Sequence, residues 1–421
     1  MTNLQMPLES RPPSVSYFYL NLAGVMAAAL TLAWSFILRP GDGLFALAVA
    51  GGMLFIVVAT GEALILRGRM RASSGLAQRP LRGVSWAATF QRCLGLLITL
   101  AACAAVYWLF PEYQDAFYGP YWRFLRFLGP FVLLLAPIYF RWTGERQIDK
   151  EDAYLQLGRF ALTVGRSSLE RRTLVLHVTG WVIKAFFLPV MVSYFVQDAE
   201  STIPSWGHVS FNEVGIFQFG FNFTYLIDLL IAVVGYTLTV CILDTRIRTT
   251  DPTLLGWMVT LICYRPIFPL LVGSVYLKVN HEVFWATELA DYPVLQTVWF
   301  LAIMATFVLH LATMASFGLR FSNLTHRGII TNGPYRFTKH PHYIAKNVAW
   351  WLISMPFISH SGWVEALRNS CLMLLTSGVY YLRAKTEERH LMRDPLYAAY
   401  SAWIDQHGLF RAWWKKKVAT N

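Results

Sequence analysis

The stretch Leu44–Leu66 reads LFALAVAGGMLFIVVATGEALIL, and its only ionisable side chain is that of Glu62. A helix needs about 20 mainly apolar residues to cross the hydrocarbon core of a bilayer, and this run supplies them without interruption. A helix that packs against the core of a soluble protein would instead carry polar residues on the face exposed to solvent. The stretch therefore predicts a membrane-spanning helix, and it decides the fold class.

The rest of the chain repeats this pattern. Of its 421 residues, 56% are hydrophobic and 14% are charged, whereas ordinary soluble domains are about one quarter charged. Further segments of spanning length and apolar composition are Ser16–Leu38, Phe90–Phe110, Trp122–Phe140, Leu174–Val196, Phe223–Leu243, Leu254–Leu277, Val294–Phe317, Tyr343–Ile358 and Val364–Leu382. The sequence predicts an all-α polytopic membrane protein with about ten transmembrane helices.

The basic residues lie between the predicted spans rather than along one face. The net charge of +12 therefore indicates topology, and no nucleic-acid partner is expected. The loops that follow even-numbered spans are basic, and their residues include Arg67, Arg71, Arg141, Arg146, Arg246, Arg248, Arg320 and Arg327. The odd-numbered loops carry acids such as Glu112, Asp198 and Glu282. Because basic loops stay inside, both termini are expected to be cytoplasmic.

The cysteines give no sign of a metal or disulfide framework. All of them fall within predicted spans, and none forms a CxxC pair: Cys93, Cys103, Cys241, Cys263 and Cys371. Zinc sites and disulfide scaffolds use paired or regularly spaced cysteines outside hydrocarbon. No metal site is expected.

Four of the ionisable residues inside predicted spans stand out, because an ionisable group there costs roughly 2.5 to 3.5 kcal/mol on insertion scales. Glu62 is near a span end, so its side chain is expected to reach the interface. Lys184 and Asp228 lie in neighbouring spans and could form a structural ion pair or a substrate-headgroup site. Arg265 precedes Pro266, which predicts a helix kinked around a polar cavity. Lys184, Asp228 and Arg265 are the candidate substrate residues.

The stretch Thr325–Tyr343 (THRGIITNGPYRFTKHPHY) carries the first chemical signal. Asn332–Pro334 predicts a turn, and Pro341 suits the first position of a helix. The free amides of a helix N-terminus favour a carboxylate such as that of an amino-acid-like cofactor. The aromatic faces of Tyr335 and Tyr343 could hold a cation or an adenine ring. Alternatively, the stretch is only a basic loop beside the membrane.

A second polar stretch, Arg383–Leu391, follows the last predicted span. Its adjacent carboxylates, Glu387 and Glu388, could accept hydrogen bonds from a ribose or pair with a loop arginine. They could equally belong to a solvated helix end. Spacing alone leaves both interpretations open.

Together, the two stretches match a family pattern. The matching residues are Gly333-Pro334-Tyr335, Lys339-His340-Pro341, Tyr343, Arg383, Glu387-Glu388 and Leu391. This layout, two polar motifs on either side of a short helical hairpin, resembles the isoprenylcysteine carboxyl methyltransferases, and related phospholipid methyltransferases have a similar one. The resemblance covers about Leu319 to Trp403.

The resemblance implies that the two motifs enclose S-adenosylmethionine near the cytoplasmic surface. The cofactor contacts that it implies are Tyr335, Lys339, His340, Pro341, Tyr343, Glu387 and Glu388. It also implies that Arg383 and Glu388 lie near the transferred methyl group and the acceptor, as catalytic residues. In this sequence Lys339 stands where the family has arginine, and Ala345 where it has glycine. Lysine keeps the charge and lacks the planar fork, so a bidentate grip on a carboxylate is not expected from it.

The resulting hypothesis is a membrane methyltransferase in two regions. Residues 1–292 would form a transmembrane bundle for substrate recognition, and residues 293–421 the methyltransferase-like part. The expected reaction is O-methylation of a carboxylate on a lipid-like acceptor that enters from the bilayer. We expect an integral membrane protein whose cofactor site lies on the cytoplasmic face. In a bacterium, the membrane would be the inner membrane.

Three rival functions remain open on the sequence. One is N-methylation of a phospholipid amine. Another is a reductase that uses NADPH, because sterol reductases share a related His-Pro and tyrosine pattern. A third is a transporter, since the chain has many spans with ionisable residues inside them.

Overall fold

The fold is a bundle of long apolar helices. The computed structural model describes residues 10–149, 151–276, 278–279 and 282–409. Within these residues, 7 helices are long and apolar enough to cross a membrane. They are α1 (Phe18–Leu38), α2 (Gly43–Ile65), α3 (Trp86–Leu109), α4 (Gly119–Arg146), α6 (Arg171–Thr202), α7 (Glu213–Thr237) and α10 (Pro293–Phe317). The prediction of an all-α membrane protein is confirmed.

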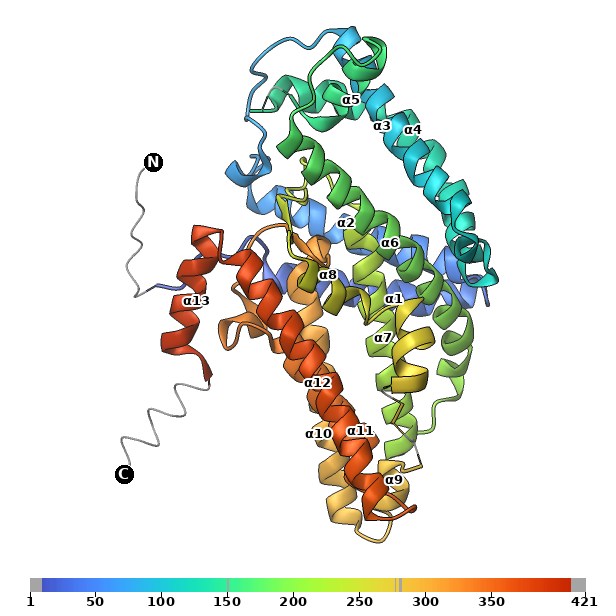
Figure 1. Cartoon of the computed structure of the whole chain (residues 1–421). Coiled ribbons are helices and arrows are strands. Elements are labelled where there is room, and N and C mark those ends of the chain that lie inside the picture. The colour runs from blue at the N-terminus through green and yellow to red at the C-terminus, as the bar shows by residue number, and fades with distance from the viewer. Residues whose placement is uncertain (1–9, 150, 277, 280–281, 410–421) are drawn as a thin grey trace.

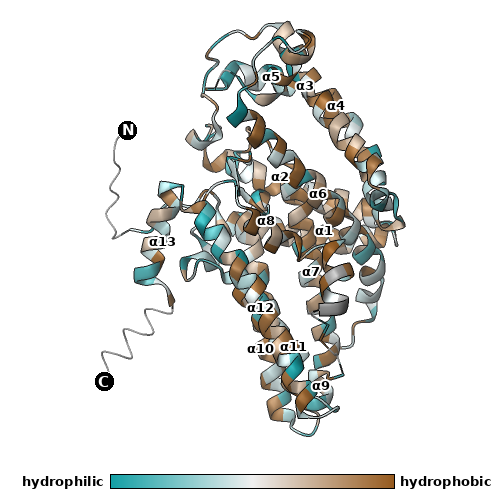
Figure 2. Cartoon of the chain, in the orientation of Figure 1, coloured by the Kyte–Doolittle hydropathy of each residue, from teal (hydrophilic) through white to brown (hydrophobic). Residues whose placement is uncertain are grey.

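The shorter elements connect or flank these helices. They are α5 (Ala153–Leu162), β1 (Thr249–Thr250), α8 (Leu254–Leu261), α9 (Trp285–Glu288), β2 (Thr325–His326), α11 (Pro341–Ser354), α12 (Trp363–Leu391) and α13 (Pro395–His407). Figure 1 shows α10, α11 and α12 running side by side, with α13 beside the end of α12. Hydrophilic residues gather at that end of α12 and on parts of α13, whereas α1, α2 and α7 are largely apolar (Figure 2).

The core is built around α6 and α7. Phe187 and Ile227 are fully buried there, and Leu54 of α2 is fully buried against them. Helix α10 packs against both α1 and α7. The two regions predicted on either side of residue 293 therefore share one bundle, and their division of labour stays a prediction.

One predicted span is broken rather than kinked. We expected a continuous helix over Leu254–Leu277, but α8 ends at Leu261 and a separate π-helix covers Phe268–Tyr276. Pro266 lies in the gap; it lacks a backbone donor and disfavours helical geometry at the residue before it. The predicted spans at α11 and α12 form helices, but those helices fall outside the length and hydropathy criterion that the others meet. The total of ten spans stays a prediction.

The loops predicted to share one side of the membrane do meet. The amide of Ala77, after α2, donates a hydrogen bond to the carbonyl of Arg146, at the end of α4, over 2.8 Å. Strand β1, after α7, pairs with β2, after α10. The hydroxyl of Ser73, after α2, donates a hydrogen bond to the carboxylate of Asp244, after α7, and so connects the two pairs. Four of the basic loops therefore gather at one end of the bundle, as the charge pattern predicts. Their cytoplasmic location stays a prediction.

The side chain of Glu62 does not extend to the membrane interface, contrary to the prediction. Its carboxylate accepts hydrogen bonds from both terminal nitrogens of Arg320 over 2.8 and 3.0 Å. Arg71 lies 3.5 Å away on another side, and Glu62 is only 8% exposed. A forked, charge-assisted pair of this kind compensates for burial. Glu62 therefore joins α2 to the end of α10.

Candidate active site

The two polar stretches singled out in the sequence face each other. Nε2 of His340 lies 3.0 Å from Oε1 of Glu388 and donates a hydrogen bond to it. The hydroxyl of Tyr343 donates to Oε2 of Glu387 over 3.1 Å. Residues at the start of α11 and the end of α12 thus form one continuous polar contact.

Local sequence explains why these side chains lie at helix ends. Pro341 is the first residue of α11, where a missing backbone donor costs nothing. Helix α12 continues past its apolar part into charged residues, and Asp394 then caps α13 by accepting a hydrogen bond from the amide of Leu396. The hydroxyl of Tyr400 on α13 donates to the carbonyl of Tyr335 over 2.6 Å, which holds the loop before α11 in place.

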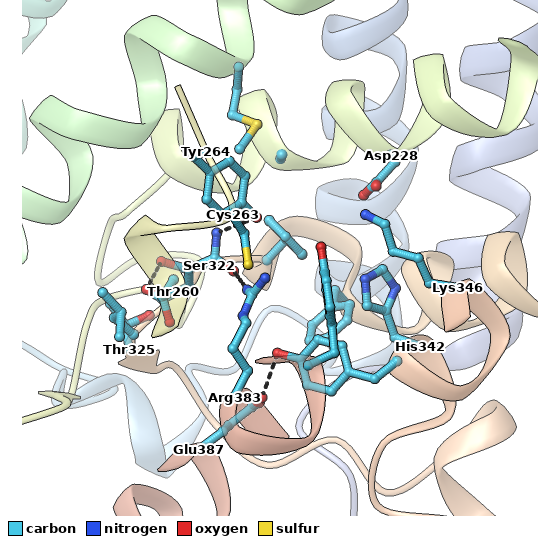
Figure 3. Close-up of a pocket in the computed structure, with 18 of the residues that line it drawn as sticks. Asp228, Thr260, Cys263, Tyr264, Ser322, Thr325, His342, Lys346, Arg383 and Glu387 are labelled. Atoms are coloured by element: carbon cyan, nitrogen blue, oxygen red, sulfur yellow. Dashed lines mark hydrogen bonds between the residues drawn. The ribbon is translucent and has the colours of Figure 1, made fainter. Parts of the chain in front are cut away.

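A cavity of about 270 Å³ opens beside this contact (Figure 3). It lies between α7, the broken segment around residue 265, the loop after α10, α11 and α12. The predicted residues that line it are Asp228, Arg265, Tyr335, His340, Tyr343, Arg383 and Glu387. We call it the polar cavity.

Arg383 is the buried cation of the polar cavity. It is 6% exposed, and its guanidinium carbon lies 5.4 to 5.8 Å from the ring centres of Tyr264, Tyr343 and Tyr380. Its Nη2 donates to Oδ1 of Asn323 over 3.1 Å. Among the described residues it has no carboxylate within ion-pair distance. A buried guanidinium without an anion is costly, so this site favours an anionic ligand.

Asn323 is a site residue that the sequence did not reveal. Besides accepting from Arg383, it donates through Nδ2 to the hydroxyl of Tyr264, and its backbone amide donates to the hydroxyl of Tyr236. Its loop is held by Arg327, whose guanidinium donates to five backbone carbonyls. Asn323 lies ten residues before the first motif, so motif spacing gave no signal for it.

Two predicted cofactor residues lie on the other side of His340. Lys339 and Glu388 line a separate groove between α11, α12 and α13, and not the polar cavity. Lys339 pairs with Asp405 over 2.8 Å, and Glu388 pairs with Lys385 over 3.0 Å. The hydrogen bond from His340 lowers the pKa of Glu388 to about 2. The structure thus divides the other predicted cofactor residues between two faces of the His340 and Tyr343 side chains, and Pro341 lines neither space.

The predicted partners Lys184 and Asp228 do not pair. Nζ of Lys184 lies 3.4 Å from the ring centre of Trp181 and 3.4 Å from Oγ1 of Thr239. Asp228 pairs instead with His310 of α10, at 3.5 Å. Helix α7 ends at Thr237, and a helix rises about 1.5 Å per residue, so Asp228 lies about 13 Å along the helix axis from the end that leads to Thr239. Lys184 lines neither the polar cavity nor the apolar cavity next to it, whereas Asp228 lines both.

This apolar cavity has a volume of about 690 Å³. Helices α7, α10, α11 and α12 contribute most of its wall, with side chains such as Phe221, Phe307, Ile353 and Val379. It shares Tyr225, Asp228, Cys263, Phe268, Lys346 and Tyr380 with the polar cavity. The two spaces therefore adjoin, one charged and one apolar.

Comparison with known proteins agrees with the motif pattern. Residues 294–393 match the model of the family described as "Isoprenylcysteine carboxyl methyltransferase (ICMT) family". No curated protein and no solved structure matches the sequence. The matched segment runs from α10 to just beyond α12 and includes both polar motifs. The C-terminal part of this membrane protein is therefore similar to a family of membrane methyltransferases, which supports an enzyme of that class.

Proposed function

We propose that this protein is a membrane enzyme that transfers a methyl group from S-adenosylmethionine to a carboxylate on an amphiphilic acceptor. The observation that carries the proposal is Arg383, a buried cation without a carboxylate partner among the described residues. It lines the polar cavity next to an apolar cavity large enough to take an acceptor's tail. A charged anchor beside an apolar space suits a ligand with an anionic head.

The residues of the polar cavity fit the proposed cofactor. The ring of His340 stacks on Tyr343 at 5.5 Å, which offers a flat face for a nucleoside. The carboxylate of Glu387 can accept hydrogen bonds from ribose hydroxyls. The first amides of α11 and its partial positive charge favour the cofactor's carboxylate. When bound, S-adenosylmethionine supplies an electrophilic methyl group on a positively charged sulfur.

Arg383 performs the orienting step for the acceptor. A carboxylate is ionised at neutral pH, so its oxygen needs no general base to act as nucleophile. A guanidinium can hold one carboxylate oxygen and leave the other directed at the methyl carbon. With the cofactor bound, this orientation would let the carboxylate oxygen bond to the methyl carbon while the carbon–sulfur bond breaks and leaves its electron pair on sulfur. Holding the reacting atoms in line supplies several kcal/mol, of the order of the effect of orientation in other reactions.

Glu388 supports this reaction indirectly. Because its Oε1 holds Nε2 of His340 from the groove side, it fixes the imidazole that borders the cofactor space. We therefore assign it a positioning role rather than contact with the reacting atoms. Pro341 contributes by starting α11, and Lys339 through its pair with Asp405.

The rival functions predict different ligands. An amine acceptor would leave Arg383 facing a cation, which is unfavourable. An NADPH reductase needs free basic side chains for phosphate. Lys339 is already paired with Asp405, and Arg336 does not line the polar cavity. A transporter needs no cofactor. These contrasts favour carboxyl methylation.

The test is transfer of a labelled methyl group. Purified protein in lipid nanodiscs is incubated with methyl-labelled S-adenosylmethionine and membrane lipid extract, and the product is then treated with alkali. A methyl ester releases its label as methanol, whereas an N-methyl group keeps it. We expect alkali-labile label that the variant Arg383→Gln no longer forms. Alkali-stable label, or no transfer, would contradict the proposal.

A further inference from the structure

Four ionisable side chains gather deep between the spans, beyond Arg383. Oδ2 of Asp228 on α7 lies 3.5 Å from Nε2 of His310 on α10. The ring of His310 contacts that of His342 on α11, with centres 4.6 Å apart. Lys346 lies one turn after His342 on the same face of α11, and its amine and the Asp228 carboxylate point toward each other in Figure 3. We call these four residues the junction cluster.

The junction cluster lies where the two cavities adjoin. Asp228 and Lys346 line both cavities, His342 lines the polar cavity, and His310 lines the apolar cavity. An acceptor whose carboxylate lies at Arg383 and whose tail occupies the apolar cavity must pass these side chains. The cluster therefore contacts the part of the acceptor that joins its head to its tail.

Burying these ionisable side chains between membrane-spanning helices costs free energy. Asp228 and His310 belong to α7 and α10, two of the helices that meet the spanning criterion. Nδ1 of His342 is buried, and it has no hydrogen-bond partner among the described residues. An unpaired buried nitrogen costs about 1 to 3 kcal/mol. A plain hydrocarbon chain would leave that cost in place, whereas a hydrogen-bonding group would remove it.

We propose that the junction cluster is a binding site for an uncharged hydrogen-bonding group, an amide or a hydroxyl, that lies between the acceptor's carboxylate and its apolar tail. The inference rests on the proposed function and specifies its substrate class. Asp228 accepts hydrogen bonds, Lys346 donates them, and the imidazoles can do either. Because Asp228 and Lys346 have opposite charges, a charged group would meet a like charge, and a neutral one meets none.

The acceptor is accordingly a polar-linked amphiphile rather than a simple fatty acid. The amide of an N-acyl amino acid, or the hydroxyl of a hydroxylated acid, supplies the required group. Such a group keeps the cluster hydrogen-bonded when the acceptor displaces water from the junction, and an unsubstituted chain does not.

Two probes of equal chain length test this. N-palmitoylglycine carries an amide next to its glycine carboxylate, and nonadecanoate lacks the amide. Their affinities are measured by titration into the full-length protein in nanodiscs with S-adenosylhomocysteine present. We expect N-palmitoylglycine to bind about tenfold more tightly, equivalent to about 1.4 kcal/mol.

Two variants test whether the junction cluster causes the tighter binding of the amide probe. His342→Leu should reduce the difference in affinity between the probes to less than about threefold, because one lost hydrogen bond accounts for most of a tenfold difference. Thr376→Val, in the wall of the apolar cavity only, is the matched control and should keep the full preference. Cooperative thermal unfolding of both variants, with a midpoint close to that of the unaltered protein, shows that they are folded.

The outcomes separate this inference from the proposed function. Equal affinity of the two probes, or binding of neither, overturns the inference, even if labelled methyl is transferred to carboxylates in lipid extract. A preference that survives His342→Leu also overturns it. Failure of the proposed function appears differently, as the absence of alkali-labile methyl transfer.

Discussion

Two buried arginines near the same end of the bundle have opposite surroundings. Arg320, just after α10, is held by both oxygens of Glu62. Arg383, near the end of α12, contacts the neutral Asn323 and tyrosine rings, and no carboxylate of the described residues lies within ion-pair distance of it. Both are almost fully buried. A cation whose anion is supplied by the protein stabilises the fold, and a cation without one is available to a ligand. The contrast distinguishes a structural arginine from a functional one.

The largest expected effect is on activity at Arg383. Arg383→Gln should reduce methyl transfer by about 100- to 1000-fold, the loss typical of removing a group that orients charge at a reaction centre. The unfolding midpoint should change little, because no protein carboxylate loses its partner. The rate is measured with labelled S-adenosylmethionine, and stability by thermal unfolding in detergent. Full activity would remove Arg383 from the site.

Arg320→Gln should have the reverse profile. Removing this side chain leaves the carboxylate of Glu62 buried with only Arg71 nearby, and breaking a buried pair costs about 3 to 5 kcal/mol. Unfolding measurements should show that loss, and the double variant Glu62→Gln with Arg320→Gln should recover part of it. Protein that remains folded should still bind the cofactor. Unchanged stability would contradict the structural assignment.

A third variant converts one environment into the other. Asn323→Asp places a carboxylate beside Arg383, so the guanidinium acquires an internal partner, as Arg320 has. We expect methyl transfer to fall by about 10- to 100-fold through weaker acceptor binding, at 1.4 kcal/mol per factor of ten, while stability is kept. Asn323→Ser is the matched neutral control and should retain more activity. An acceptor KM that is unaffected by Asn323→Asp would count against the anionic acceptor.

Substitution of Glu388 should have a smaller effect, and this effect should be on cofactor affinity alone. Glu388→Gln keeps the shape and weakens the hydrogen bond from His340, and hydrogen bonds to charged groups are worth about 1.5 to 3 kcal/mol. Affinity for S-adenosylhomocysteine should fall by roughly tenfold or more, and the transfer rate should fall with it at limiting cofactor. A normal affinity with no transfer would instead indicate a direct catalytic role.

The smallest effect concerns pH. The pKa of Glu388 is lowered from 4.5 to about 2, so the carboxylate is ionised at neutral pH in the folded and unfolded protein alike. Its contribution to stability is present above about pH 4.5 and is lost as the pH falls toward about 2. Unfolding measured between about pH 5 and 2 should therefore show a loss of stability that is smaller in Glu388→Gln than in the unaltered protein. An equal loss of stability in the two proteins would contradict the pairing of Glu388 with His340.

The sequence predicted the class of fold and the meeting of the two motifs better than it predicted individual partners. Spans follow from composition, and the family pattern on either side of the α11–α12 hairpin is confirmed as a family match. The pairing of Lys184 with Asp228 was wrong, because hydropathy gives neither the relative height nor the rotation of neighbouring helices. Glu62 was misread for a related reason, since its partner Arg320 is 258 residues away.

The residues that sequence analysis missed were hidden by their context. His310 lies within an apolar span, and a single histidine among its 25 residues leaves the mean hydropathy of the span high. Lys346 falls in the predicted span Tyr343–Ile358 and was not singled out among the ionisable residues inside spans. Asn323 lies outside both motifs and acts through its contact with Arg383. Only the folded arrangement brings these side chains to the two cavities.

The central claim is that the start of α11 and the end of α12 make one nucleoside site. Calorimetric titration of the purified protein with S-adenosylhomocysteine, and separately with NADPH, tests it most directly. We predict saturable binding of S-adenosylhomocysteine alone, lost in Tyr343→Ala and kept in Tyr381→Ala, a tyrosine of α12 outside the polar cavity. Binding of NADPH in its place, or of neither ligand, would contradict the account.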